Sequence, residues 1–297
     1  MKILITGATG LVGSALYRLW QVNHEVIVLS RNAAKAKRIL GADCQVFTQL
    51  DEIDFNHLDV VVNLAGESIA DKRWSEARKA IICQSRWQLT EQLSGKILAA
   101  TTPPHTLINA SAIGYYGRQS AERIDESFDS FYPEFSHDIC ARWENLANRS
   151  RSAKTRVCIL RIGIVVAQQG GALAKMLPAF RFGLGGRLGS GEQMMSWIHL
   201  DDLTSAIDFL LQQPQCDGIF NATAPMAVSN SQWTELLGNR LGKKTPFPMP
   251  AFFARILFGE LSDLLLFGQN VYPQRLIAAG FQFKYNQLRS AFAALTL

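Results

Sequence analysis

The sequence contains few cysteines, and their spacing excludes two kinds of cross-linked protein. Five cysteines are scattered over 297 residues, and no two of them stand in a Cys-x-x-Cys arrangement. An odd number at such spacing is typical neither of a disulfide framework nor of a zinc site. We therefore expect a protein of a reducing compartment that holds no metal.

Long apolar runs are also absent. A helix that spans a bilayer needs roughly eighteen consecutive apolar residues. The segment 257–267 comes closest, and Glu260 and Asp263 interrupt it. The N-terminus enters a strand-like run at once, without the basic and long apolar regions of a secretory leader. These features lead us to expect a cytoplasmic protein with no membrane partner.

Basic residues outnumber acidic ones, but they do not form the pattern of a nucleic-acid-binding surface. The net charge is +5, and no run of basic residues is interleaved with aromatic residues. An anionic cofactor and a small-molecule substrate explain the excess more simply than a nucleic acid does. The sequence leaves the oligomeric state open between a monomer and a homodimer.

Apolar, β-branched runs alternate with helical stretches along most of the chain. Such continuous runs are typical of strands that are buried on both faces of a parallel sheet. Their alternation with helices predicts a doubly wound α/β sheet, the Rossmann fold. The predicted strands are 2–6, 25–30, 44–48, 59–64, 106–111, 156–162 and 219–222, and the predicted helices lie near 11–21, 75–100, 137–150 and 201–213.

The alternation breaks down near residue 163. Glycines cluster at 170–171 and over 182–191, and the tail is rich in proline. Long glycine-rich segments are usually surface connections or lids. We expect a dinucleotide-binding domain over residues 1–162, to which 199–222 returns, and a smaller C-terminal region over 163–297 that forms one wall of a substrate cleft.

The most informative feature is a Gly-x-x-Gly-x-x-Gly turn between the first apolar run and an amphipathic helical stretch. In a dinucleotide-binding turn, the first glycine permits the turn, the second the close approach of the pyrophosphate, and the third the packing of the helix. Free backbone N–H groups and the helix dipole then attract the diphosphate. A purely structural turn is the alternative. The candidate residues are Gly7, Thr9, Gly10, Leu11, Val12 and Gly13.

The end of the second predicted strand indicates which dinucleotide binds. An acidic residue there would bind the ribose 2′-hydroxyl of NAD, whereas an arginine accommodates the 2′-phosphate of NADP. This chain has Ser30 and Arg31 and no acidic residue at that point. We therefore predict that NADP(H) is preferred over NAD(H), although Arg31 can also be a solvated residue at the start of a helix.

Several motifs together resemble the extended short-chain dehydrogenase/reductase superfamily. Residues 7–13 look like its cofactor loop, residues 63–66 like its fourth-strand motif, and residues 197–202 like its late strand-to-helix motif. Further matches over almost the whole chain narrow the resemblance to an atypical branch, the epimerase-like YfcH-type family. These matches are Asn63–Glu67, Arg73–Trp74, Ser85–Trp87, Gly114–Gly117, Cys140–Glu144, Gly183–Gly186, Ser196–His199 and Pro273–Arg275.

The resemblance implies an NADP-binding fold whose substrate is not settled. It implies that Leu64, Ala65, Gly66 and Glu67 lie along the adenine and ribose side of the cofactor. Arg86 takes the place of an asparagine that ordinary members carry, and a guanidinium there suits a cofactor phosphate or an acidic partner. Glu67 can receive a ribose hydroxyl or pair with Arg86.

The resemblance also shows what is missing. Ordinary members use a Tyr-x-x-x-Lys pair, in which the lysine helps a tyrosine of pKa near 10 to transfer a proton. Cys140 and Glu144 stand where this pair belongs. Cys140 is either a catalytic thiol or a small buried hydrophobe. Glu144 is either a base or the partner of an arginine such as Arg86 or Arg161.

Other candidates for catalysis follow the fifth predicted strand, at the edge where ligands of such sheets bind. Ser111 can polarise a carbonyl or satisfy a turn. Tyr115 and Tyr116 can reach a substrate or pack against the cofactor. His199 is a possible proton shuttle, with a core histidine as the alternative. The catalytic candidates we retain are Ser111, Tyr116 and Cys140.

Three functions are compatible with these features. The first is an NADP(H)-dependent oxidoreductase or epimerase-like protein that lacks the usual proton-transfer pair. The second is a non-catalytic module for which NADP(H) is a structural or sensed ligand, because fold alone does not establish activity. The third is an adaptor that uses the apolar segments 256–258 and 264–267, for which core packing is the simpler explanation.

Overall fold

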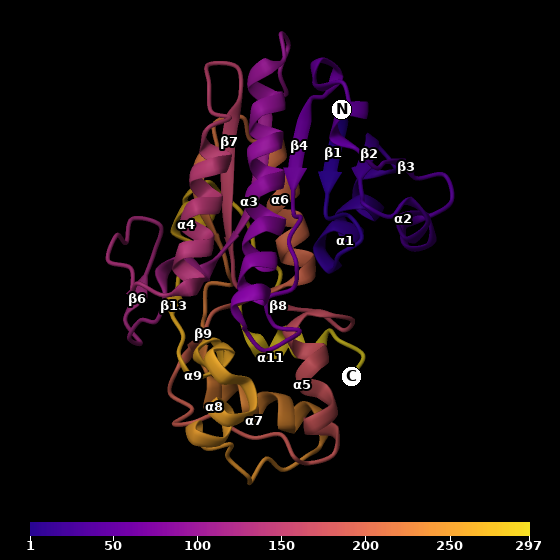
Figure 1. The fold of residues 1–297 in the computed structure, drawn as a ribbon. Helices are drawn as coiled ribbons and strands as arrows, with labels where there is room; N and C mark the ends of the chain where they lie inside the picture. The colour runs from indigo at the N-terminus through magenta and orange to yellow at the C-terminus, as the bar shows by residue number, and fades with distance from the viewer.

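A seven-stranded parallel sheet forms the centre of the protein (Figure 1). The computed structural model describes residues 1–297 and gives the strand order β11-β7-β5-β4-β1-β2-β3. The predicted doubly wound sheet is thereby confirmed. Its strands are β1 (Lys2–Thr6), β2 (Glu25–Leu29), β3 (Gln45–Phe47), β4 (Val60–Asn63), β5 (Thr106–Ala112), β7 (Arg156–Ile162) and β11 (Gly218–Ala222).

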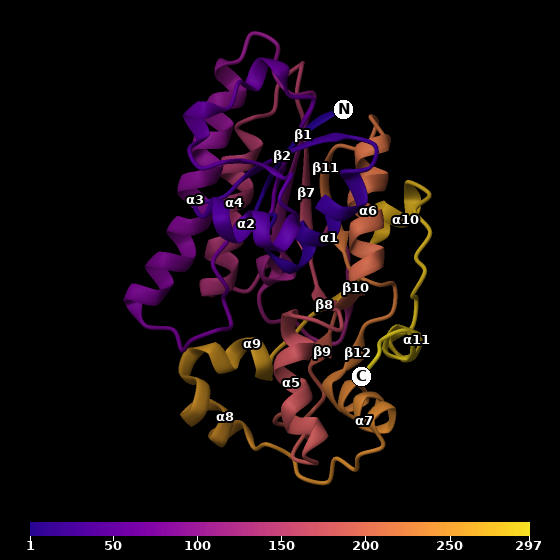
Figure 2. The same ribbon diagram turned by 90° about the vertical axis from the view of Figure 1, so that its right-hand side faces the viewer.

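Helices cover both faces of this sheet, as Figure 2 shows with the sheet seen on edge. Alternate residues of one strand therefore enter different cores. Ile3 and Ile5 pack on one side with α1 and α6, whereas Leu4 packs on the other side with α3 and α4. The helices are α1 (Leu11–Trp20), α2 (Ala33–Leu40), α3 (Glu76–Ala99), α4 (Phe135–Asn148) and α6 (Leu200–Gln212).

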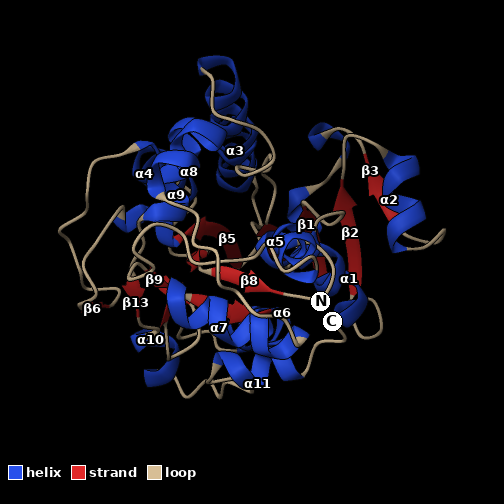
Figure 3. Cartoon of the chain, turned by 90° about the horizontal axis from the view of Figure 1, so that it is seen from below, coloured by secondary structure: helices blue, strands red, loops and turns tan.

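A second hydrophobic core lies below the carboxyl edge of the sheet and joins Leu173, Trp233 and Phe292 from three helices. Figure 3 shows these helices from below, beside the short strands that connect them to the sheet. The other elements that follow β7 are β8 (Ile164–Val166), α5 (Gly171–Arg181), β9 (Met194–Met195), β10 (Trp197–His199), β12 (Val228–Ser229), α7 (Asn230–Leu241), α8 (Ala251–Phe258), α9 (Asp263–Leu266), α10 (Gln274–Ala278) and α11 (Leu288–Ala293). Of these, α10 packs on the sheet, with Leu276 in the same core as Ile3 and Ile5. Two further short strands, β6 (Arg123–Ile124) and β13 (Asn270–Val271), pair with each other, and 3₁₀ turns occur at Leu50–Glu52, Phe55–His57, Ile113–Tyr116 and Gly259–Ser262.

No helix combines the length and the apolar composition that crossing a bilayer requires. Two residues of the apolar tail segments are not packed in a core, as we had expected them to be. Ile256 and Leu257 are 51% and 54% exposed, because they lie on the outer face of α8, whereas residues 264–267 are half-buried.

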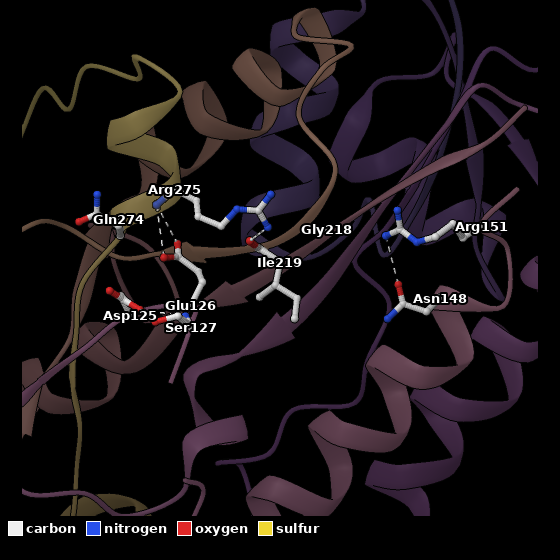
Figure 4. A pocket seen from close by; sticks show the side chains of 9 residues that line it. All are labelled: Asp125, Glu126, Ser127, Asn148, Arg151, Gly218, Ile219, Gln274 and Arg275. Carbon is white, nitrogen blue, oxygen red and sulfur yellow. Dashed lines mark hydrogen bonds between the residues drawn. The ribbon is translucent and has the colours of Figure 1, made fainter. Parts of the chain in front are cut away.

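β11 is the outermost strand of the sheet, and side chains from two distant segments bind to its outer edge (Figure 4). Arg275 donates hydrogen bonds to the carbonyl oxygens of Ile219 (2.7 Å) and Asp217 (2.6 Å). The Glu126 carboxylate accepts a hydrogen bond from the Asn221 N–H (2.8 Å). A cavity of about 550 Å³ opens beside these residues. Unpaired edge groups are templates for aggregation, so Arg275 and Glu126 protect this edge.

We expect Arg275→Ala to lower the free energy of unfolding by about 1–3 kcal/mol, because two edge carbonyls lose their donors. The variant should also aggregate faster on warming. Urea unfolding and light scattering measure the two effects. Gln274→Ala is the matched control, since Gln274 lines the same cavity and its side chain makes no hydrogen bond. Equal stability of the two variants would contradict the protective role of Arg275.

Candidate functional site

The glycine turn lies at the carboxyl end of β1, beside the neighbouring strand β4, where the order of the strands in the sheet reverses. Gly7 has φ +72°, and a Cβ atom on it would lie 2.6 Å from the backbone of Leu64. A Cβ atom on Gly13 would lie 2.4 Å from the Gly7 carbonyl oxygen. Both glycines are therefore required by packing within the turn, before any ligand is considered.

Gly10 differs from these two glycines. Its φ of −81° and ψ of 175° suit any residue, and a Cβ atom there would meet only the Gly7 oxygen, at 3.2 Å. Gly10 is exposed and, as the N-cap residue of α1, offers no side chain to cap the helix. The N–H groups of Leu11, Val12 and Gly13 donate no hydrogen bond within the protein. They leave an open cradle of unpaired donors, with the half-buried Thr9 beside it.

A second helix start without a side-chain cap lies beside this cradle, a position that our sequence analysis did not predict. Gly170 is the N-cap residue of α5 and also provides no side-chain cap. A Cβ atom on Gly170 would lie 3.5 Å from the Leu11 side chain. The Gly170-Gly171 pair was the available signal, but only the folded chain brings it next to α1.

Arg31 lies at the carboxyl end of β2 and is exposed. Its guanidinium makes no hydrogen bond or ion pair within the protein. Asn32, not Arg31, caps α2 by accepting a hydrogen bond from the Lys35 N–H (2.8 Å). Ser30 lies beside it, with its hydroxyl 3.3 Å from the Asn32 carbonyl oxygen. The guanidinium is thus free to meet an anion at this edge of the sheet.

A buried polar network fixes the end of β4. The Asn63 side chain accepts a hydrogen bond from Thr6 (2.6 Å) and donates to Thr90 (2.8 Å) and Asn109 (2.6 Å). Trp143 also donates to the Thr90 hydroxyl (2.9 Å). These bonds join β1, β4, β5, α3 and α4, so they determine where residues 64–67 leave the sheet.

Gly66 and Glu67 lie against Arg86. A Cβ atom on Gly66 would lie 2.9 Å from the Arg86 guanidinium carbon. Arg86 donates hydrogen bonds to the carbonyl oxygens of Glu67 and Ile82 (3.0 Å each), and burial lowers its pKa. The Glu67 carboxylate pairs with Arg78 (3.1 Å), so it does not pair with Arg86 as one of our alternatives supposed.

Glu144 forms a buried ion pair with Arg161. The two carboxylate oxygens accept hydrogen bonds from Arg161 Nε and Nη2, both at 2.9 Å, and Ser111 donates to the same carboxylate at 2.7 Å. Burial lowers the pKa of Arg161, but the hydrogen bonds and charge of Glu144 outweigh it, so the pKa is raised. Of the alternatives for Glu144, the structure shows pairing with Arg161. The Arg161 guanidinium also lies 3.4 Å from the ring centre of Tyr115.

The thiol of Cys140 is buried. Burial, together with the negative charge of Glu144, raises its pKa to about 11. The thiol is therefore protonated at neutral pH, and it does not have the electropositive, exposed surroundings of a reactive cysteine.

Tyr116 and His199 are also enclosed. Tyr116 is fully buried, and its hydroxyl donates to the Asn221 side chain (2.8 Å). The catalytic role we expected for Tyr116 therefore has no exposed atom to act through. His199 Nδ1 accepts a hydrogen bond from the Asp201 N–H (3.1 Å) and caps α6, while burial lowers the His199 pKa. It is a neutral core histidine in this structure.

Comparison with known proteins identifies the family. The model of the NAD dependent epimerase/dehydratase family matches residues 3–222, and that of a domain of unknown function, DUF1731, matches residues 249–295. The chain belongs to the NAD dependent epimerase/dehydratase family. This confirms the resemblance to an atypical epimerase-like branch of the short-chain dehydrogenases/reductases.

Members of this epimerase/dehydratase family match nearly the full chain. An epimerase family protein of Mycobacterium bovis is 38% identical, with 99% of this chain and 97% of that protein covered. The crystal structure of human epimerase family protein SDR39U1 with NADPH has a TM-score of 0.90 at 32% identity and covers 98% of both chains. UDP-glucuronic acid 4-epimerase from Bacillus cereus, in complex with UDP-glucuronic acid and NAD, has a TM-score of 0.78, with 99% of this chain and 97% of that chain covered; at 16% identity it supports the fold alone.

We expect Glu144→Ala to lower the free energy of unfolding by about 3–5 kcal/mol, because it leaves the Arg161 charge buried without a partner. Urea unfolding followed by circular dichroism measures this loss. Asp51→Ala is the control, since Asp51 pairs with Lys96 on the surface and such pairs contribute about 0–1 kcal/mol. Similar losses in the two variants would show that the Glu144–Arg161 pair is not the buried link described above.

Proposed function

We propose that this protein binds NADP(H) at the carboxyl edge of β1, β2 and β4, and that it is an oxidoreductase or epimerase-like protein. The observation that carries the proposal is the cradle of unpaired N–H groups at the start of α1. Beside it, Gly10 has no neighbouring atom except the Gly7 oxygen in the direction of a side chain. Family membership supports it, as does the NADPH in the crystal structure of the related human protein.

Three groups of residues would hold the cofactor. The turn around Gly10 would bind the diphosphate, Ser30 and Arg31 the 2′-phosphate, and residues 64–67 the adenine and ribose side. Arg86 donates a hydrogen bond to the Glu67 carbonyl oxygen and would thereby fix the position of residues 64–67. The free guanidinium of Arg31 and the lack of an acidic residue beside it favour NADP(H) over NAD(H). The full set is Gly7, Thr9, Gly10, Leu11, Val12, Gly13, Ser30, Arg31, Leu64, Ala65, Gly66, Glu67 and Arg86.

When bound, NADP(H) supplies hydride transfer. The chain would hold the substrate between the carboxyl end of β5 and the C-terminal region 163–297. Within that region, residues 199–222 would belong to the dinucleotide-binding domain. Ser111 is buried and its hydroxyl donates to Glu144, so it would hold the Glu144–Arg161 pair in place rather than contact the substrate. Tyr115 is a better candidate than Tyr116 for contact with the substrate, because it is only half-buried and its hydroxyl makes no hydrogen bond within the protein.

A non-catalytic NADP(H)-binding module is the second candidate, and one observation favours it. Cys140 is neutral and buried, and Glu144 is committed to Arg161, so neither replaces the usual tyrosine and lysine. A screen of carbonyl compounds and nucleotide-sugars for NADPH oxidation separates the two candidates. Turnover that is lost in Tyr115→Phe supports the enzyme, whereas tight NADPH binding without turnover supports the module.

We expect Arg31→Ala to weaken NADPH binding by about tenfold or more, because a charged hydrogen bond to the 2′-phosphate contributes about 1.5–3 kcal/mol. NADH binding should stay unchanged. Calorimetric titration with both dinucleotides measures the ratio. Arg38→Ala is the matched control, since Arg38 is equally exposed but lies in the last turn of α2. An unchanged preference in Arg31→Ala would refute the 2′-phosphate assignment.

We expect Gly10→Ala to preserve the fold and to weaken the binding of NADP, NADPH, NAD and NADH alike by about tenfold or more. The backbone of Gly10 accepts a side chain, so the new methyl group would occupy the space that the diphosphate requires. Thermal unfolding and calorimetry measure the two effects. Gly95→Ala on the exposed face of α3 is the control, because a Cβ atom there meets nothing. Full affinity in Gly10→Ala would argue against a diphosphate in this cradle.

A further inference from the structure

Two segments at the end of the molecule farthest from the N-terminus expose an unusual amount of apolar surface. We call residues 181–190 and 242–258 together the apolar pole; Figures 1 and 2 show α8, which belongs to it, at the end of the molecule opposite the N-terminus. The segments run side by side, since the Met249 N–H donates a hydrogen bond to the Arg187 carbonyl oxygen (2.8 Å) and the Gly189 N–H donates one to the Met249 carbonyl oxygen (2.9 Å). Seven of the protein's fifteen exposed large hydrophobic side chains lie in them, namely Phe182, Leu184, Phe247, Phe252, Phe253, Ile256 and Leu257.

Helix α8 contributes four of these side chains from one face. Residues 252, 253, 256 and 257 follow the spacing of a single helical face, and Ala254 faces the protein interior and is fully buried. The solvent face of α8 is therefore the apolar one. A helix that is apolar on its solvent face normally has a partner that covers it.

The charges of the apolar pole have one sign. Its five charged residues are Arg181, Arg187, Lys243, Lys244 and Arg255, and it contains no acidic residue. All five are exposed, and none of their side chains makes an ion pair or a hydrogen bond within the protein. Elsewhere many surface cations are paired, as in Lys79 with Glu260 and Lys96 with Asp51. The covering partner should therefore be anionic.

Contrary to our expectation from the sequence that there is no membrane partner, we propose that the apolar pole docks on an anionic lipid surface, with its aromatic side chains in the interface and its five cations among the headgroups. A second copy fits poorly, because a two-fold contact would bring like charges together. A peptide groove also fits poorly, because Phe182 and Phe247 are 81% and 66% exposed and project from loops. Large apolar side chains beside free Lys and Arg are typical of segments that lie in the membrane interface.

Flotation of the full-length protein with vesicles tests this proposal. We expect it to bind vesicles of phosphatidylcholine with about a third phosphatidylserine, and to bind pure phosphatidylcholine at least tenfold more weakly. Raising the salt from about 0.1 to 0.5 M should weaken binding several-fold, because the charges are screened. Absence of binding to the anionic vesicles, or equal binding to both kinds, would overturn the proposal.

Two pairs of variants locate the contact. Phe252→Ser with Phe253→Ser, and separately Lys243→Glu with Lys244→Glu, should each reduce vesicle binding at least tenfold while NADPH affinity stays unchanged. The controls are Leu19→Ser with Val22→Ser, which are exposed apolar residues outside the pole, and Arg18→Glu with Arg38→Glu, which change the net charge equally. Controls that reduce binding as much as the pole variants would overturn the assignment.

The same variants separate the competing occupants. Sedimentation of the protein alone tests for a dimer. A dimer that dissociates in the Phe252→Ser and Phe253→Ser variant, in a protein that binds no vesicles, would assign the pole to a second copy. Specific binding of an acidic protein, without vesicle binding, would assign the pole to a protein partner. Either result overturns the lipid proposal and leaves the NADP(H) proposal untouched, since the pole is separate from the glycine turn.

Discussion

The close approach of β1 and β4 at the glycine turn is the constraint on which the rest of the site depends. Because Gly7 has no side chain, its backbone can lie against Leu64 and Ala65, and Gly13 can lie on the Gly7 carbonyl. This contact fixes the direction of α1, so that its first N–H groups open at the carboxyl edge of the sheet. The Asn63 network then fixes the neighbouring strand end from inside the core. The site is formed mainly by backbone whose position is set before any ligand binds.

The two residues that stand where we expected the tyrosine and lysine of ordinary members are part of the scaffold. Cys140 and Glu144 lie one turn apart on α4, and Arg161 reaches across from β7 to neutralise the carboxylate. A buried carboxylate that is held by a bidentate arginine and a serine donor has its hydrogen-bonding capacity taken up by these partners. In the proposed function, chemistry at this edge would therefore rely on the cofactor and on accessible groups such as the half-buried Tyr115.

Sequence reasoning located the strands well because the strands of a parallel sheet are buried on both faces, and each therefore appears as a continuous apolar run. It allowed a helix to start at Arg31 but gave no bounds for α2, whose alternating Ala and Lys residues look like a solvated stretch. It also set no bounds for the helices of the tail, where proline and glycine obscure the helical period. It placed Arg31 correctly at a strand end. It did not foresee that Tyr116 is enclosed, because its hydrogen-bond partner Asn221 is 105 residues away in the sequence.

The sequence by itself determined the sheet, the glycine turn and the family, since these depend on local patterns of apolar residues and glycine. Only the tertiary structure decided which polar groups are free and which are committed. Arg31 is free while Arg86, Arg161 and Arg275 are each held by hydrogen bonds, and no local pattern distinguishes these four arginines. The same holds for α8, whose composition suggested a core helix. Burial depends on what the rest of the chain places beside a residue, and at α8 the chain leaves one apolar face open to solvent.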